Sequence, residues 1–332
     1  MLCVLAASAF AQLSFSGSVY AGVRLQQENG DQTIDAYHRE GWNRTPRFDF
    51  AATVTRENYG ARLDTTFQMT DDPNAHFILN GIYGWIDFDG FLDNDALRLT
   101  MGQINSTPWV LPRFLPSHSE IKYGDVRGFR VEYTTPLPGL NVGMAFRAEG
   151  HDLQGMAERI IFGATYIHHL FSAVFAYDLS NNAQTLFGFN FTGIPDLTAG
   201  IQLEASRLAT WDHPSYGYPG TLQMYYKVGY RIMRPLNVFL VFGQRFHGQS
   251  NTGPYWEITP GVEYRFLPNL LGTLSLTLDN YFGSPDNNLT INAGIEYTLR
   301  GPAVLYAEYL LRLDNMDRAT HTFGFGITVR AF

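Results

Sequence analysis

The chain has 332 residues, of which 15% are aromatic and 16% charged, and its formal net charge is −8. An acidic chain without a basic patch or stripe gives no sign of a nucleic-acid partner. Cys3 is the single cysteine, which excludes a disulfide framework and a thiolate metal site. No apolar run approaches the ~18 residues that a membrane-spanning helix needs.

The first residues are apolar and then small, as at the end of a secretory signal. Ala9-Phe10-Ala11 fits the small-x-small cleavage pattern, although the basic n-region of such a signal is missing. We therefore expect a signal peptide over residues 1–11, with its n-region truncated, and a mature start at Gln12. Because no composition break or linker divides the rest, we expect a single domain over 12–332.

That domain begins and ends with an alternation of apolar and polar residues. The pattern is clear in 12–25, and in the last stretch Phe323 and Phe325 alternate with Thr322, Gly324 and Gly326. A period of two indicates β-strands. Bulky apolar groups on one face, with charge and glycine on the other, are typical of a transmembrane β-barrel.

Turn residues divide the alternating segments into a regular series of short and long connections. Short turns occur, for example, at 136–139, 193–196 and 268–269, and longer polar stretches, the first of them 26–44, fall between them. Eight short turns and nine longer loops predict 18 strands, with 16 as the alternative. We therefore expect an all-β fold, a transmembrane antiparallel up-and-down β-barrel.

The apolar face is expected to point outward into lipid. A barrel of 16 or more strands is too wide for side chains to fill, and a closed barrel satisfies its backbone groups within the membrane. Aromatic residues then fit girdles at the two interfaces. Candidates for the girdles are Trp85, Tyr133, Tyr226, Trp256 and Tyr297.

The opposite register predicts a lumen in which bases and acids nearly balance. The predicted pore-lining residues are Arg24, Arg47, Asp49, Arg62, Asp64, Arg98, Arg130, Glu132, Arg147, Glu149, Glu204, Lys227, Arg231, Glu257, Glu263, Arg265, Asp279, Glu296, Glu308 and Arg312. In the outer half, bases come from early strands and acids from late ones, which predicts a transverse field. The alternative is that these charges only pair across strands and solvate the wall.

One long loop, 106–126, differs from the other connections because it is rich in proline and apolar residues. Long loops without secondary structure tend to be functional. We expect this loop to fold into the lumen and narrow it, and a subunit contact outside the barrel is the alternative. The predicted constriction residues are Trp109, Arg113, Glu120, Lys122 and Asp125.

Motifs of catalysis are missing from the sequence. It contains no Gly-x-Ser-x-Gly, His-Glu-x-x-His, phosphate-binding loop or dinucleotide fingerprint. We therefore expect no enzyme, no cofactor and no metal site. Most of the nine histidines, His38 among them, are expected in solvated loops or at strand ends.

With these features the chain resembles the outer-membrane porins of Gram-negative bacteria. The resemblance rests on the signal-like start, the immediate first strand, the terminal Phe332 and the long loop after the fifth strand. It also rests on 125–150, which looks like the porin hairpin that follows the constriction loop: an Arg-bearing strand, a Pro-containing turn and a Gly-bearing return strand.

The resemblance implies an outer-membrane location and a water-filled channel for passive diffusion of small hydrophilic solutes and ions. It implies contact with lipid and lipopolysaccharide, and recognition of the C-terminal strand, ending in Phe332, by the barrel assembly machinery. It also implies that a homotrimer could form. The alternative functions are a substrate-specific channel, a transporter of hydrophobic solutes, and a closed structural or adhesive barrel.

Overall fold

The computed structural model describes most of the predicted domain. The described residues are 12–38, 45–68, 76–90, 96–111, 121–123, 125–148, 160–179, 184–206, 220–247, 255–280, 287–299, 302–314 and 318–331. The predicted signal peptide and Phe332 lie outside them. Within these ranges we find no helix that is long and apolar enough to cross a membrane.

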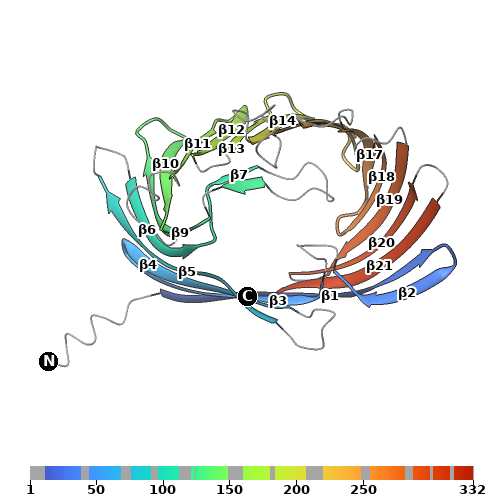
Figure 1. The fold of residues 1–332 in the computed structure, drawn as a ribbon, viewed down its shortest axis with the longest axis horizontal. Coiled ribbons are helices and arrows are strands. Elements are labelled where there is room, and N and C mark those ends of the chain that lie inside the picture. The colour runs from blue at the N-terminus through green and yellow to red at the C-terminus, as the bar shows by residue number, and fades with distance from the viewer. Residues whose placement is uncertain are drawn as a thin grey trace, which may run out of the picture.

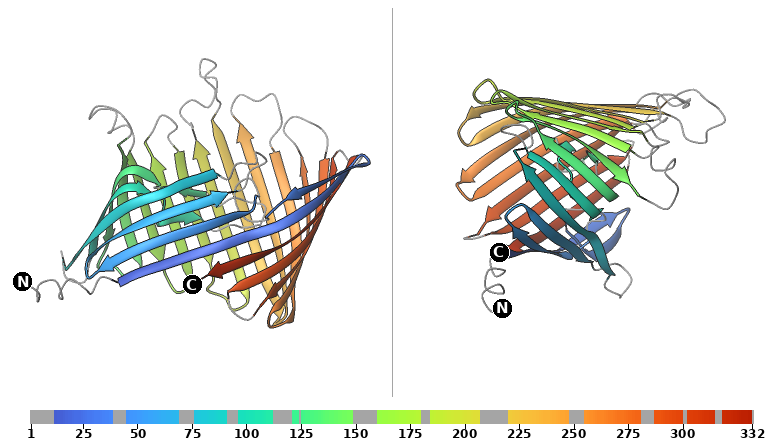
Figure 2. Two further views of the ribbon diagram at one scale, coloured as in Figure 1. Left: turned by 90° about the horizontal axis from the view of Figure 1, so that it is seen from below. Right: turned by 90° about the vertical axis from the view of Figure 1, so that its left-hand side faces the viewer.

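A continuous antiparallel sheet forms the wall, and each strand pairs with the next along the chain (Figure 2). Its strands are β1 (Gln12–Glu28), β3 (Arg47–Arg56), β4 (Tyr59–Gln68), β5 (His76–Asp89), β6 (Ala96–Ile104), β9 (Val126–Thr134), β10 (Leu140–Arg147), β11 (Ile160–Ile167), β12 (Phe171–Asp178), β13 (Gln184–Phe191), β14 (Leu197–Ser206), β15 (Thr221–Met233), β16 (Leu236–His247), β17 (Tyr255–Leu267), β18 (Leu270–Asn280), β19 (Asn287–Thr298), β20 (Ala303–Asp314) and β21 (Arg318–Ala331).

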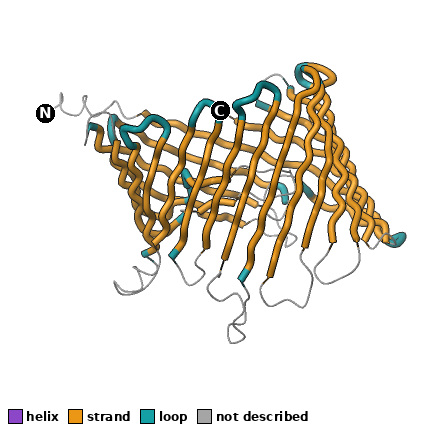
Figure 3. The backbone as a smooth tube through the Cα atoms, turned by 90° about the horizontal axis from the view of Figure 1, so that it is seen from above, coloured by secondary structure: helices purple, strands orange, loops and turns teal. Residues whose placement is uncertain are grey.

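The sheet closes where its first strand meets its last. β1 pairs with β21 from Gly17↔Ala331 to Glu28↔Thr320. The result is a closed barrel of 18 strands, so the predicted fold class is confirmed and the 16-strand alternative is wrong. The first and last described residues lie at the rim that carries the short turns, opposite the longer connections (Figure 3).

The first polar stretch is not the simple loop that we expected. β1 continues to Glu28, Asn29 and Gly30 turn with φ of 51° and 94°, and β2 (Asp31–Ala36) returns along β1. Asn-Gly favours the tight hairpin turn that needs positive φ at both residues. β2 therefore continues the row of β3 along the same edge of β1, because β3 pairs only with its first half.

Large apolar side chains of alternate residues are exposed on the outside of the barrel. Leu13 is 56% exposed, Ile295 52% and Phe325 62%. Neighbouring rings of this face touch across strands, with Phe48 and Phe67 stacked at a centroid distance of 6.1 Å. Exposure of such an apolar surface to water would be unfavourable, whereas contact with the hydrocarbon chains of lipid is favourable.

Two short strands lie inside the wall instead of in it. β7 (Trp109–Leu111) and β8 (Ile121–Tyr123) form a separate two-stranded sheet, and β7 lies within the ring of barrel strands (Figure 1). They belong to the long loop 106–126, which we had expected to lack secondary structure. β7 and β8 pair their backbone N–H and C=O groups with each other, because a segment away from the wall cannot pair them with the barrel strands.

We predict that Ile295→Arg impairs barrel assembly, whereas Thr298→Arg on the same strand is tolerated. Ile295 faces outward, and an arginine facing lipid costs about 2–4 kcal/mol near the midplane. Thr298 has the inward register, where arginine stays hydrated. The measurement is the fraction of protein that shows heat-modifiable migration after refolding in detergent. Equal yields for the two variants would contradict this assignment of the faces, and a lower yield for Thr298→Arg would mean that they are reversed.

Candidate functional site: the barrel lumen

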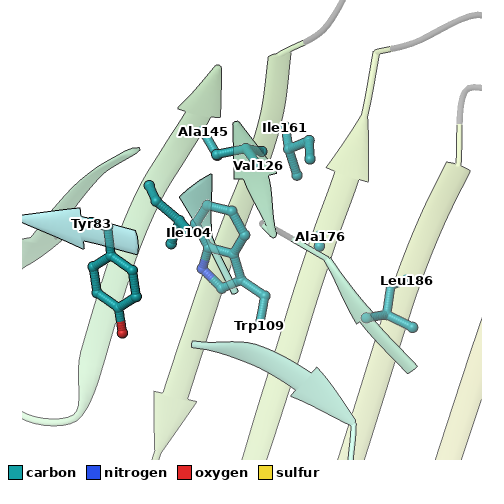
Figure 4. Packing of buried hydrophobic residues seen from close by; sticks show 8 residues of the cluster. All are labelled: Tyr83, Ile104, Trp109, Val126, Ala145, Ile161, Ala176 and Leu186. Atoms are coloured by element: carbon teal, nitrogen blue, oxygen red, sulfur yellow. The ribbon is translucent and has the colours of Figure 1, made fainter. Parts of the chain in front are cut away.

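Trp109 marks the inner surface of the barrel. Its side chain is 1% exposed and packs with Ile104, Val126 and Ile161 in one apolar cluster (Figure 4). A Cβ atom at Gly163 of β11 would overlap the Trp109 ring. The loop thus reaches into the barrel as expected, and the wall admits the indole because a glycine stands behind it.

Further contacts fix the start of the same segment to the wall. Arg130 of β9 is 5% exposed, and its guanidinium donates to the Ser106 carbonyl and to Glu132, the latter at 2.8 Å. The Trp109 amide donates to Thr107 Oγ1 at 3.1 Å. Charge-assisted bonds are stronger than neutral ones, so the segment is held by an arginine as well as by packing.

The position of Trp109 also identifies the inward register of every strand. Gly143 and Gly163 lie behind the ring and pair directly, and directly opposed residues of neighbouring strands share a face. The inward face traced in this way carries Arg24, Arg47, Asp49, Arg62, Asp64, Arg98, Arg130, Glu132, Arg147, Glu204, Lys227, Arg231, Glu257, Glu263, Arg265, Asp279, Glu296, Glu308 and Arg312.

Those positions belong to the predicted pore-lining set, but their role in conduction stays a prediction. Four other predicted residues cannot be placed in full. Glu149, Arg113 and Glu120 lie outside the described residues, and the side chain of Lys122 on β8 does too. Asp125 is half-buried just before β9.

Several inward charges remain accessible to water. The side chains of Arg98, Arg231 and Arg312 are 48%, 59% and 49% exposed, although all three point into the barrel. All three lie two residues from the end of their strand, so they are hydrated near the rims of the barrel.

On the wall made by the early strands, arginines are paired with carboxylates. Arg98 binds Asp87 at 2.6 and 2.8 Å, and Arg147 lies 3.3 Å from Asp178. The same holds for Arg24 with Asp35 at 2.9 Å, Arg47 with Asp49 at 3.1 Å, Arg62 with Asp64 at 2.8 Å and Arg130 with Glu132 at 2.8 Å. This wall is close to locally neutral, so the expected basic wall of a transverse field is absent among the described residues.

Carboxylates on the opposite wall hold neutral donors as well as nearby bases. Glu308 accepts from the Tyr37 hydroxyl at 2.6 Å, and Glu263 accepts from Asn237 at 3.0 Å. Asp279 accepts from Asn288 at 3.1 Å. A tyrosine or asparagine donor satisfies a carboxylate oxygen without cancelling its charge. These donors leave the carboxylate charges in place, and bases lie near two of them, Lys227 near Glu263 and Arg312 near Asp279.

His38 is not in a solvated loop, which corrects the expectation from sequence. Its side chain is fully buried, and its ring packs edge-on against Tyr20 and Tyr306, at centroid distances of 4.8 and 5.3 Å. Nε2 lies 3.0 Å from Thr328 Oγ1. The preceding residue, Tyr37, is 2% exposed. The chain after β2 therefore turns inward over the β1–β21 seam.

Trp85 is also misplaced in our sequence prediction. It shares the inward register of Tyr83 and Asp87, its ring covers Gly60, and the Arg98 guanidinium lies 5.7 Å from the ring centroid. It packs against the Trp109 cluster and not in an interfacial girdle. The physical reason is the missing side chain at Gly60, which leaves room on the inner wall.

Some acidic partners of the arginines were not among the predicted residues. Asp87 lies near the end of β5 and Asp178 ends β12, both in the inward register and each opposite or beside an arginine. Strict counting of alternate residues to the end of each strand would have found them. Among the described residues, no group of three His, Cys, Asp or Glu side chains could hold a metal ion.

The fold defined by this wall and its inward segment is that of bacterial porins. The chain superposes on the outer-membrane channel DcaP of Acinetobacter baumannii with a TM-score of 0.53 and 14% identity, covering 97% of each chain. It superposes on a triple mutant of the Rhodopseudomonas blastica porin with a TM-score of 0.57 and 12% identity, covering 96% of this chain and 100% of the porin. No family model and no curated protein matches.

We predict that Trp109→Ala raises single-channel conductance. The truncation removes a fully buried indole, a loss of about 3–5 kcal/mol of packing, and releases the segment from the wall. Trp256→Ala is the matched control, because Trp256 has the outward register on β17. The measurement is conductance of the purified protein in planar bilayers. If both variants conduct like the parent, the segment does not narrow the path.

Proposed function

We propose that this protein is an outer-membrane porin, a water-filled channel for passive diffusion of small hydrophilic solutes and ions. One observation carries the proposal: a closed barrel of 18 strands has an inner face that carries many charged side chains, with arginines about half exposed near its rims. Barrels of 16–18 strands leave an aqueous channel. The inward segment around Trp109 then narrows this channel on one side.

The outer surface supports a membrane location for the proposed channel. Its exposed apolar residues would contact lipid and, in the outer leaflet, lipopolysaccharide. The solved structures with the same fold include an outer-membrane channel and a porin, by their own descriptions. The proposal includes cleavage after residue 11, assembly through the strand ending in Phe332 and formation of a homotrimer.

The charge distribution adds a direction of ion preference to the proposal. Arginine–carboxylate pairs neutralise the early wall, whereas Glu263 and Glu308 on the late wall bind neutral donors. A charged wall raises the local concentration of counter-ions in a channel. We therefore infer a modest preference for cations instead of the balanced transverse field expected from sequence.

We predict that the double variant Glu263→Gln, Glu308→Gln lowers the preference for cations. Removing two negative charges from the lumen should move the reversal potential, measured in a potassium chloride gradient, toward the equilibrium potential of chloride. The shift should be largest at low salt, where the Debye length is about 30 Å at 0.01 M and screening is weak.

Glu57→Gln provides the control, because Glu57 lies in the exposed turn between β3 and β4 at the rim. An unchanged reversal potential in the double variant would refute the proposed preference. A barrel that assembles but carries no current would refute the channel itself and favour the closed structural barrel.

A further inference from the structure

A polar pocket lies on the inner wall, apart from the apolar cluster around Trp109. Its volume is about 310 Å³, and it spans β1, β3, β4 and β5. Its lining includes Ser16, Ser18, Asp49, Asp64, Thr66 and Asn80. Small-molecule pockets begin at roughly 300 Å³, so this one suits a small solute.

The floor of the pocket is built by an irregularity in the sheet. The β4–β5 pairing shifts register between Asp64 and Thr65. Asp64, Thr65 and Thr66 are 8%, 5% and 7% exposed, so three successive polar residues are buried where strict alternation would bury only every second one. Bulges re-aim side chains in this way and often lie beside functional sites.

Hydrogen bonds preorganise this floor. Thr66 Oγ1 donates to Asp49 Oδ1 at 2.7 Å and accepts from the Asn80 amide at 2.6 Å. Arg62 and Arg47 hold Asp64 and Asp49 at 2.8 and 3.1 Å. Because both carboxylates already have an arginine, a charged solute would gain little net attraction. Their remaining lone pairs can still accept hydrogen bonds.

Asn105 adds an acceptor at the edge of the pocket. It lines the pocket from the start of the inward segment, and its side chain lies against Gly81 of β5, where a Cβ atom would touch it. Its Oδ1 is buried and has no hydrogen-bond partner in the described part of the chain. A buried acceptor without a partner is uncommon and calls for an explanation. A rotation of the Asn105 side chain away from Gly81 would let this oxygen accept from a donor on a bound solute.

We propose that this pocket binds a small, uncharged, polyhydroxylated solute such as a monosaccharide. The lining offers carboxylate oxygens and the Asn105 oxygen as acceptors, and the Ser16 and Ser18 hydroxyls as donors or acceptors. The neighbouring hydroxyl groups of a sugar ring can use both the acceptors and the donors of this lining. Ser16 is exposed and Asp49 half-buried, so the lumen gives access. The assignment rests on the proposed function, since it makes the pocket a solute site along the channel.

The test is the single-channel current of the purified full chain in a planar bilayer with rising concentrations of glucose. Binding should lower the current in a saturable way. Ser16→Val together with Ser18→Val should raise the half-saturating concentration about two- to tenfold per lost hydrogen bond. Ser14→Val is the matched control, because Ser14 has the same inward register on β1 but does not line the pocket.

Asn105→Ala gives a second variant outside the wall strands, in case the serine variant does not assemble. It should raise the half-saturating concentration by a similar factor. A glucose response that only follows viscosity, or one that all variants share, would overturn the assignment. Saturable block by lysine but not by glucose would overturn the proposed solute class.

Equilibrium dialysis of radiolabelled glucose against the detergent-solubilised barrel separates this inference from the proposed function. If the barrel carries no current but binds glucose saturably, and the serine variant weakens that binding, the pocket stands and the channel fails. If current flows normally and dialysis finds no saturable glucose binding, the channel stands and the pocket fails.

Discussion

Closure of the sheet through the β1–β21 pairing is the constraint on which the other features depend. In lipid each unpaired backbone group costs several kcal/mol, so a spanning sheet cannot leave an edge. β1 meets this requirement with a long strand that pairs with β21 from Gly17↔Ala331 to Glu28↔Thr320. Closing at 18 strands then produces an interior too wide for wall side chains to fill, and the inner face must be polar.

A wide interior is narrowed here by a chain segment and not by larger wall residues. Such a segment needs a place to rest, and Gly143 and Gly163, paired on neighbouring strands, provide a flat area for the Trp109 ring. Arg130 then binds the Ser106 carbonyl where the segment leaves the wall. Glycines on the inner wall of a barrel can thus make room for a large side chain that a loop places against the wall.

The sequence was most informative where a pattern repeats and least informative where single contacts decide. The series of turns and loops predicted the strand count, and alternation predicted the inward register of the charged residues, because a period of two follows from strand geometry. It could not reveal that His38 turns inward or that Trp85 fills the space over Gly60. Those positions depend on which distant strands become neighbours. The sequence contains the Asn-Gly turn signal at Asn29-Gly30, but the polar residues around it led us to predict a loop and not a hairpin.

The distribution of charge follows from the same pairing geometry. Inward residues that oppose or flank each other on the early strands are Arg and Asp or Glu, as with Arg98 and Asp87, so ion pairs form within the wall and leave little net field. On the late strands, most inward carboxylates oppose uncharged residues, as Glu263 opposes Asn237 and Thr273, whereas Glu257 and Asp279 oppose each other. Selectivity in such a lumen therefore depends less on how many acids and bases it contains than on which of them are cross-strand neighbours.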